Sequence, residues 1–351
     1  MNLNDVGWDA AWEAAFQLHA PAGCEPARAV AEHRGAHVLL GAGGEYRAGV
    51  AGRLRHLAAD AAGLPAVGDW VFVTRDAAGE TATVRGLLPR RTAFVRRAAG
   101  METAPQVLAA NIDVVLVAMA LDLDFSVDRV ERYLTLAWES GAQPRVVLTK
   151  ADLCSDLDGA VEAVSAVSFG VPVSATDAAR PRSFEPIAEL LGAGLTGVVL
   201  GSSGVGKSTL INRLLGEERQ AVSALAADGT GRHTTTVRQL LTLPAGGCVI
   251  DTPGLREVQL WAASDGLDAT FADVEELAVR CRFRDCVHRT EPGCAVLAAI
   301  ADGSLPEHRL ERYRKLEREL RWAESRGDAR ARAEERRRWA QINRDLRTTR
   351  W

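Results

Sequence analysis

The run GSSGVGKSTL at residues 201–210 is the feature that most constrains how this chain can fold, because it matches the phosphate-binding pattern GxxxxGK[ST]. The apolar run TGVVL precedes it and helix-forming residues follow it, which is the context that the pattern requires. In that context the backbone N–H groups of the loop surround phosphate oxygens, and the helix N-terminus adds its dipole. The sequence therefore predicts an α/β domain with a phosphate site. The predicted site residues are Gly201, Ser202, Ser203, Gly204, Val205, Gly206, Lys207, Ser208 and Thr209.

Side chains in and after this loop have the chemistry of a triphosphate and Mg²⁺ site. Lys207 is expected to reach the β- and γ-phosphates, and the Ser208 hydroxyl is expected to bind Mg²⁺. The polar segment GRHTTT at residues 231–236 precedes a predicted strand, and a threonine from it would complete the Mg²⁺ shell. Thr235 is the predicted ligand and Thr236 the alternative.

The run CVIDTPG predicts the second triphosphate motif. Asp251 ends a strand there and suits a carboxylate that holds Mg²⁺ from outside its first shell, and the N–H of Gly254 is placed to sense a γ-phosphate. DTPG after a strand is also compatible with an ordinary turn. Its position after a phosphate loop favours the nucleotide motif.

A base-recognition loop is predicted upstream, at residues 149–152. TKAD follows the buried strand PRVVL and has the form [NT]KxD, in which the aspartate accepts hydrogen bonds from guanine and the lysine stem lies against the base. In the later run PVSA, Ser174 and Ala175 could offer backbone donors to the guanine O6. The predicted loop residues are Thr149, Lys150, Ala151 and Asp152.

The order of these motifs predicts a circular permutation, because the base loops precede the phosphate loop in the chain. A permutation changes which surface connection is cut without moving the strands of the sheet. The strand and helix alternation of residues 105–262 predicts a doubly wound sheet with its ligand site at the strand ends. Residues 105–200 are therefore expected to form half of the nucleotide pocket.

The chain is predicted to be multidomain. After an extension at residues 1–29, residues 30–104 alternate short strands with Gly and Pro turns, which favours an OB-type β-barrel, a common nucleic-acid platform. A structural β-domain without a ligand is the alternative. Residues 263–351 are predicted to form a helical C-terminal domain that carries a metal site.

That metal site is the segment CRFRDCVHRTEPGC, which brings four soft or borderline ligands together. Tetrahedral Zn²⁺ suits such a set, and three cysteines with one histidine leave no open position for substrate, so a structural site is expected. A chance juxtaposition and a redox role are the alternatives, the latter disfavoured because no CxxC pair is present. The predicted ligands are Cys281, Cys286, His288 and Cys294.

Charge is spread unevenly over a chain whose formal net charge is −4. From Leu305 to the end there are 15 Lys/Arg against 9 Asp/Glu, and the span between Thr81 and Met101 has no acidic residue. Both stretches are candidates for RNA contact, with a solvated helix as the alternative for the C-terminal one. No 18-residue apolar run and no signal-like N-terminus occur, which predicts a soluble cytoplasmic protein. The arginines of the first stretch are Arg85, Arg90, Arg91, Arg96 and Arg97.

With a barrel, permuted nucleotide motifs and CxxxxCxHxxxxxC in this order, the chain resembles the ribosome small-subunit-dependent GTPase A family of bacteria over about residues 30–320. The resemblance implies a monomeric assembly factor that binds the maturing small (30S) subunit and its 16S rRNA. It also implies ribosome-stimulated GTP hydrolysis, with GTP/GDP, Mg²⁺ and one structural Zn²⁺ as cofactors. The family usually has Asn where this chain has Thr149, and a hydroxyl cannot make both contacts of an amide, which predicts weaker nucleotide binding.

The catalytic step is the least determined by sequence. Many GTPases orient the attacking water with a glutamine just after DxxG, but Leu255 occupies that place. We hypothesise that intrinsic turnover is slow and that His233 orients water once the ribosome orders its loop, with Lys207 at the β- and γ-phosphates and Thr235 at Mg²⁺. The alternative for His233 is a bystander in a polar loop. A non-catalytic GTP-gated module and an ATP-using enzyme remain alternatives for the whole chain, the latter disfavoured by Asp152.

Overall fold

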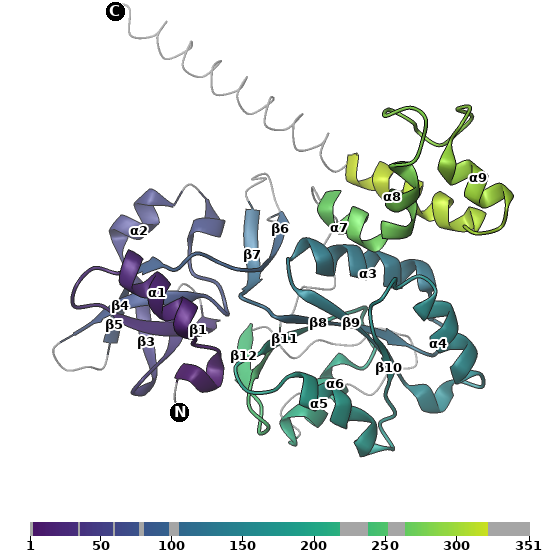
Figure 1. Ribbon diagram of the computed structural model, residues 1–351. Coiled ribbons are helices and arrows are strands. Elements are labelled where there is room, and N and C mark those ends of the chain that lie inside the picture. The colour runs from purple at the N-terminus through teal and green to yellow at the C-terminus, as the bar shows by residue number, and fades with distance from the viewer. Residues whose placement is uncertain are drawn as a thin grey trace, which may run out of the picture.

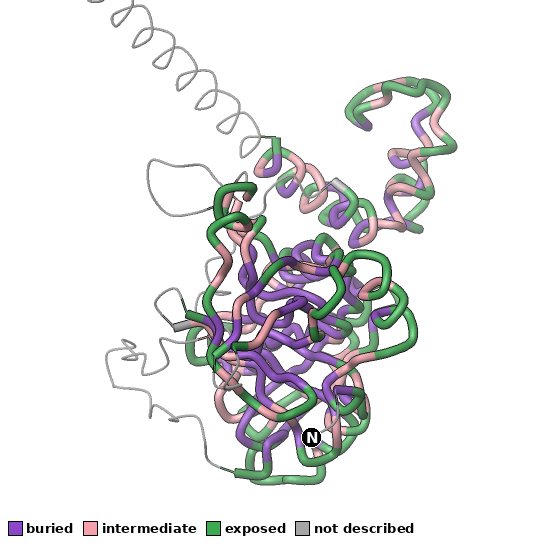
Figure 2. The backbone as a smooth tube through the Cα atoms, turned by 90° about the vertical axis from the view of Figure 1, so that its left-hand side faces the viewer, coloured by how far each residue is buried: buried purple, intermediate pink, exposed green. Residues whose placement is uncertain are grey.

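A computed structural model of the protein describes residues 3–33, 36–58, 60–76, 81–97, 105–217, 238–251 and 264–321. Figure 1 shows a small barrel beside a central sheet covered by helices, with a helical C-terminal part above the sheet. Figure 2 shows buried residues gathered in the interior, and the core clusters draw on the strands of the barrel and the central sheet. These strands therefore form the core on which the functional loops are mounted.

The N-terminal part is a closed five-stranded barrel, which confirms the predicted OB-type fold. Its strands pair in the order β1-β2-β3-β5-β4, and β4 returns to β1 to close the barrel. Inward residues alternate with outward ones along β5, as a barrel strand requires, and β1 begins at Glu25, before the predicted start at residue 30. The elements are β1 (Glu25–His33), β2 (Ala36–Gly41), β3 (Gly44–Val50), α2 (Gly52–Leu57), β4 (Trp70–Arg75) and β5 (Thr81–Leu87).

The N-terminal segment packs on this barrel. Asp9 is the N-cap of helix α1 (Ala10–His19), and its carboxylate accepts a hydrogen bond from the Trp12 N–H at 2.7 Å. Trp12 is 4% exposed, and the ring of Trp8 lies 4.7 Å from that of Trp70 in the barrel. Aromatic packing therefore attaches the segment, preceded by the short helix η1 (Leu3–Val6), to the barrel wall.

The central sheet has the strand order β10-β9-β8-β11-β13-β12, parallel except for β12. All seven residues of β8 are buried. Val115 and Val117 pack with the helix α3 side, while Leu116 packs with α5 and α6 on the other face (Figure 1), which explains the continuous apolar run. The strands are β8 (Val114–Ala120), β9 (Gln143–Thr149), β10 (Val173–Ala175), β11 (Thr196–Leu200), β12 (Gln239–Thr242) and β13 (Cys248–Asp251). The helices are α3 (Val127–Glu139), α4 (Leu157–Ser165), α5 (Glu185–Leu190) and α6 (Lys207–Leu215).

The permutation predicted from motif order is visible in this sheet. Strand β11, which leads into the phosphate loop, lies between β8, which precedes it in the chain, and β13, which follows it. Parallel pairing aligns the carboxyl ends of β8, β9, β10, β11 and β13 along one edge. Every predicted nucleotide loop among the described residues starts from that edge.

The barrel and the central sheet are joined. Strand β1 pairs with β12 through Ala31 and Gln239, so hydrogen bonding is continuous from one part to the other. A separate two-stranded sheet, β6 (Ala93–Arg97) with β7 (Pro105–Ala110), lies between the two parts in the chain.

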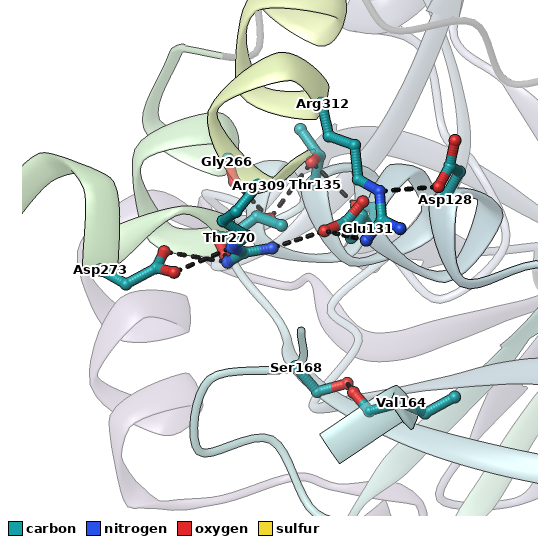
Figure 3. Close-up of polar contacts among 10 residues, drawn as sticks. All are labelled: Asp128, Glu131, Thr135, Val164, Ser168, Gly266, Thr270, Asp273, Arg309 and Arg312. Carbon is teal, nitrogen blue, oxygen red and sulfur yellow. Dashed lines mark hydrogen bonds and ion pairs between the residues drawn. The ribbon is translucent and has the colours of Figure 1, made fainter. Parts of the chain in front are cut away.

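The C-terminal helices attach to α3 through a buried charge cluster, drawn in Figure 3. Arg309, 4% exposed at its side chain, binds Glu131 of α3 at 2.5 Å and Asp273 at 2.8 Å. It also donates to the carbonyl of Thr270, and Arg312 adds a second contact to Glu131. Each of these charges has an opposite partner, but the Oε2 of Glu131 is buried without a hydrogen bond, and burial raises the pKa of that carboxyl. The helices involved are α7 (Ser264–Thr270), α8 (Ala272–Ala278), α9 (Ala295–Ala301) and a helical stretch at residues 307–321.

Candidate nucleotide site and metal cluster

The phosphate loop has the backbone that its glycines predict. Gly204 and Gly206 have φ values of 76° and 96°, in the region that glycine adopts most readily. A Cβ on Gly201 would lie 2.6 Å from the carbonyl oxygen of Ala118, because the loop passes close to β8. Lys207 opens α6 and donates from Nζ to the Gly201 carbonyl at 2.8 Å and to that of Ser202. The lysine therefore spans the loop in which a phosphate would sit, and Ser208 and Thr209 follow it in the first turn of α6.

The predicted base loop leaves the adjacent strand. Lys150 follows β9 with φ 57°, and the short helix η3 (Ala151–Leu153) then exposes Asp152. The N–H of Ala151 donates to the carbonyl of Thr176 at 3.1 Å, which ties the base loop to the end of β10. Ser174 and Ala175 are half-buried on that strand, beside β9. Both predicted base-contacting segments therefore lie side by side.

A direct hydrogen bond joins the two loops. The Oγ1 of Thr149, which is 5% exposed, donates to the carbonyl of Val205 in the phosphate loop at 2.5 Å. The hydroxyl also lies 3.4 Å from the Met119 carbonyl. Residues 56 positions apart in the chain thus meet at one edge of the sheet. The threonine makes the donor contact toward the phosphate loop that a single hydroxyl allows.

Of the other predicted triphosphate residues, Asp251 lies within the described part of the chain. Asp251 ends β13 and is half-buried, and β13 pairs with β11 through Ile250 and Val198. The carboxylate therefore belongs to the strand next to the one that carries the phosphate loop. The other predicted positions lie outside the described residues: His233, Thr235, Thr236, Gly254 and Leu255.

Two residues that sequence analysis missed contact these loops. Asp122, just after β8, binds Lys150 with Oδ2 to Nζ at 2.6 Å. Arg129, in the first turn of α3, donates to Ser202 Oγ at 3.3 Å and also pairs with Asp124. Neither belongs to a motif. Their position after β8 could have indicated them, because β8 ends at the same sheet edge as the strands that carry the predicted loops.

The Cys/His cluster forms as predicted from spacing. The Nδ1 of His288 lies 3.6 Å from Cys281 Sγ, 3.5 Å from Cys286 Sγ and 3.4 Å from Cys294 Sγ. The sulfurs of Cys281 and Cys294 are 3.8 Å apart, and all four ligand atoms lie within 4.8 Å of one another. Four such atoms around one point can hold a metal ion in four-coordinate geometry.

The backbone supports this cluster. The N–H groups of Ala295 and Leu297 point at Cys281 and Cys294 sulfurs, each at 3.4 Å. Both donors belong to the first turn of α9, whose N-cap is Cys294. N–H donors directed at sulfur favour the thiolate form, which is the form that binds metals.

Some arginines of the basic stretch between Thr81 and Met101 bind groups within the fold and are not free on the surface. Arg90 binds Asp69, whose side chain is fully buried, at 2.6 Å, and donates to the carbonyls of Ala62 and Leu64. Arg91 pairs with Asp9 at 2.8 Å. Arg85 remains exposed on β5. The sequence count of arginines therefore overstates the number available to a partner.

Within the part of the chain that the structure describes, no helix combines the length and the apolar character needed to cross a bilayer.

Comparison with known proteins agrees with the geometry. The RsgA GTPase family model matches residues 87–261. The chain is 49% identical to the small ribosomal subunit biogenesis GTPase RsgA of Opitutus terrae, over 97% of this chain and 96% of the relative. It is also 49% identical to the RsgA protein of Streptomyces coelicolor, over 95% of this chain and 90% of that one.

Solved structures agree with the observed fold. YjeQ from Thermotoga maritima matches with a TM-score of 0.66 and 26% identity, over 85% of this chain and 98% of that one. The circularly permuted GTPase YloQ matches in fold, with a TM-score of 0.63, 24% identity and coverage of 86% and 97%. With its nucleotide loops converging in permuted order and relatives matching nearly its whole length, the chain belongs to the RsgA GTPase family.

Proposed function

We propose that this chain is a Mg²⁺-dependent GTP hydrolase that assists late maturation of the small (30S) ribosomal subunit, with turnover stimulated by the ribosome. The observation that carries the nucleotide part is the 2.5 Å hydrogen bond from Thr149 to Val205. It holds a base-recognition segment against a phosphate loop, so that one purine nucleoside triphosphate can contact both. The ribosomal part is supported by the names of the relatives, small ribosomal subunit biogenesis GTPases.

In this proposal each loop has a distinct task. Asp152 accepts hydrogen bonds from guanine, and Ser174 and Ala175 offer backbone donors to its O6. Lys207 stabilises charge on the β- and γ-phosphates as the bond to the γ-phosphate breaks. Mg²⁺ would be held by Ser208 and by the remaining predicted positions, Thr235 directly and Asp251 from outside the first shell, while Gly254 senses the γ-phosphate. When bound, the ion neutralises phosphate charge.

GTP turnover titrated with purified small subunits tests the activity. Alone, the chain is expected to turn over slowly, and saturating subunits should raise the rate by at least about tenfold. ATP in place of GTP should give no stimulated turnover, because Asp152 selects guanine. An unchanged rate with GTP, together with retained GTP binding, would instead establish the alternative of a non-catalytic GTP-gated binding module.

His233 is proposed to orient the attacking water once the subunit orders its loop. A His233→Ala variant should lose about a hundredfold or more of stimulated turnover, the range expected for a positioned proton acceptor. Binding to the subunit, measured by co-sedimentation, should stay the same. Full stimulated turnover in this variant would contradict the assignment.

Contact with 16S rRNA is proposed through the barrel and the metal-bearing region. The loop around the Cys/His cluster exposes Arg282, Arg284 and Arg289, together with Phe283 at 41% exposure. Guanidinium groups pair with phosphates and an exposed ring can stack on an unpaired base. Affinity for the subunit should therefore fall steeply as salt rises, and a flat response would argue against RNA contact. The protein is proposed to act in the cytoplasm as a monomer.

Zinc is the proposed occupant of the Cys/His cluster, one ion per chain with a structural role. Zn–S and Zn–N bonds of about 2.3 and 2.05 Å in a tetrahedron separate two sulfurs by about 3.8 Å and a sulfur from a nitrogen by about 3.6 Å. The distances in the cluster, 3.8 Å and 3.4 to 3.6 Å, fit these values. Elemental analysis should give about one equivalent of zinc. Much less than that, with Cys281 freely alkylated, would contradict the proposal.

A further inference from the structure

The ion pair between Asp122 and Lys150 links the predicted base loop to the segment that follows β8. The two side chains are 27% and 23% exposed, and Oδ2 lies 2.6 Å from Nζ. Both residues follow parallel neighbouring strands, and the N–H of Leu121 donates to the Thr149 carbonyl at 2.9 Å, just before the pair. The backbones of the two segments that carry Asp122 and Lys150 are therefore held together independently of the ion pair.

The carboxylate of Asp122 is itself oriented. Its Oδ1 accepts a hydrogen bond from the N–H of Asp124 at 2.9 Å, which leaves Oδ2 directed at Lys150. Partial burial opposes ionisation of Asp122, but the hydrogen bonds from Lys150 and Asp124 outweigh it and hold its pKa below the usual value. The group is thus a fixed anion over the neutral pH range.

The same segment also reaches the phosphate loop. Arg129, in the first turn of α3, contacts Ser202 Oγ at 3.3 Å and is held by Asp124. The segment at residues 121–129 therefore touches both loops of the nucleotide site. Its contacts with them come from side chains that no nucleotide motif contains.

In the proposed site the stem of Lys150 lies against the purine ring, and its ammonium group needs a hydrogen-bond acceptor. A free lysine samples many rotamers, and ordering it opposes binding. A partner that already holds Nζ removes much of that penalty before the nucleotide arrives. Asp122 is built to be that partner, since its own orientation is set by Asp124.

We infer that Asp122 is a positioning residue for the guanine-nucleotide site, which acts through Lys150. This inference rests on the proposed function, because it takes the ligand to be a guanine nucleotide. Lys150 lies on the base side of the pocket, so Asp122 affects nucleoside di- and triphosphates alike. It is therefore a determinant of affinity for the nucleoside and not a sensor of the γ-phosphate.

The test is a double-mutant cycle on the full chain, with GDP and GTP affinities measured by calorimetry in the presence of Mg²⁺. Asp122→Asn keeps the Oδ1 acceptor for Asp124 and removes only the charge that holds Lys150. Lys150→Met keeps the apolar stem and removes the ammonium. We expect Asp122→Asn alone to weaken GDP and GTP binding by about three- to tenfold, and by less than about twofold in the Lys150→Met background.

Asp128→Asn is the matched control. Asp128 lies six positions away and pairs with Arg312 at 2.8 Å, on the side of α3 that faces the C-terminal helices. Its substitution should change neither affinity by more than about twofold. Thermal unfolding of each apo variant reports whether a loss of affinity reflects loss of the fold.

The outcomes separate the inference from the function on which it rests. An unchanged affinity in Asp122→Asn, or an equal loss in both backgrounds, overturns the role of Asp122 while GTP binding stands. If the parent chain binds ADP as tightly as GDP, or binds neither, the proposed function and the inference fail together. A loss for GTP but not for GDP would overturn the inference, because it would place the effect at the γ-phosphate.

Discussion

At the scale of single residues, Thr149 shows how a departure from the usual base-loop motif is accommodated. Sequence comparison predicts a deficit, because a hydroxyl cannot make both contacts of an asparagine amide. In the structure the hydroxyl makes one strong contact, to the Val205 carbonyl at 2.5 Å, and is almost fully buried. The threonine hydroxyl therefore links the two loops.

Replacing Thr149 with valine should weaken nucleotide binding. The shape is kept, but the Val205 carbonyl loses its buried donor, which costs about 1–3 kcal/mol. GDP affinity should fall and the apo chain should unfold at a lower temperature, as measured by calorimetry and thermal denaturation. Thr135→Val is the control, since Thr135 is fully buried on α3 and bonds Glu131 and Thr270. That variant should lower stability without lowering GDP affinity; equal GDP affinity in both variants would contradict the role of Thr149.

At the scale of elements, α3 contacts both the proposed nucleotide site and the C-terminal part. Its first turn carries Arg129, which contacts Ser202, and its second turn carries Glu131, which binds Arg309 (Figure 3). Helix α7 crosses it so closely that a Cβ on Gly266 would lie 2.3 Å from the Thr135 carbonyl. The α7–α3 crossing is thus fixed by the absence of a side chain at one position.

Gly266→Ala should force α7 away from α3. Because the obstructing atom is backbone, the clash cannot be relieved by a rotamer change, and we expect a loss of about 2–3 kcal/mol in the free energy of unfolding. Urea denaturation followed by circular dichroism measures it. Gly52→Ala is the control, because this helical glycine has open space around its Cβ position and alanine favours helix. Equal stability of the Gly266 variant and the parent would show that the helices do not pack this closely.

At the scale of the whole molecule, Arg28 joins the barrel to the central sheet. This β1 residue is 1% exposed and donates to Thr196 Oγ1 at the start of β11 at 2.8 Å, and to the Asn111 carbonyl at 3.2 Å. It also donates to the carbonyls of Gly68 and Val6. Burial lowers the pKa of the guanidinium, while neighbouring acidic groups oppose that shift. One buried side chain therefore links the barrel, the N-terminal segment and the strand that carries the phosphate loop.

Arg28→Met should uncouple these parts. Four buried acceptors lose a donor, although the Gly68 carbonyl still accepts from the Asn111 side chain at 3.1 Å. This predicts a loss of about 2–4 kcal/mol and a separate, earlier unfolding transition of the barrel. Hydrogen exchange resolved by peptide should show faster exchange in the barrel strands than in β8 and β9. The same substitution at the exposed Arg85 should change stability by no more than about 0.5 kcal/mol. A single transition at the parent midpoint in Arg28→Met would contradict this linkage.

The sequence by itself determined the local chemistry of this protein. The glycines of the phosphate loop, the TKAD run and the Cys/His spacing each specify a short backbone conformation or ligand set, so they were recognisable without neighbours. The motif order also predicted the permuted sheet, because parallel strands bring their carboxyl ends together whatever the chain order.

Only the tertiary structure decided which distant side chains meet. Asp122 pairs with Lys150, and Arg28 donates a hydrogen bond to Thr196, 168 positions away in the chain. No sequence spacing predicts either contact. The structure also pairs Arg90 with the buried Asp69, although its stretch is a candidate for RNA contact by its charge. Which side chains pair in this way depends on the strand order and on how the helices cross, and the local sequence specifies neither. Burial makes an unpaired charge very unfavourable, so a buried charge lies beside an opposite charge or a hydrogen-bonding group even when that partner is far away in the sequence.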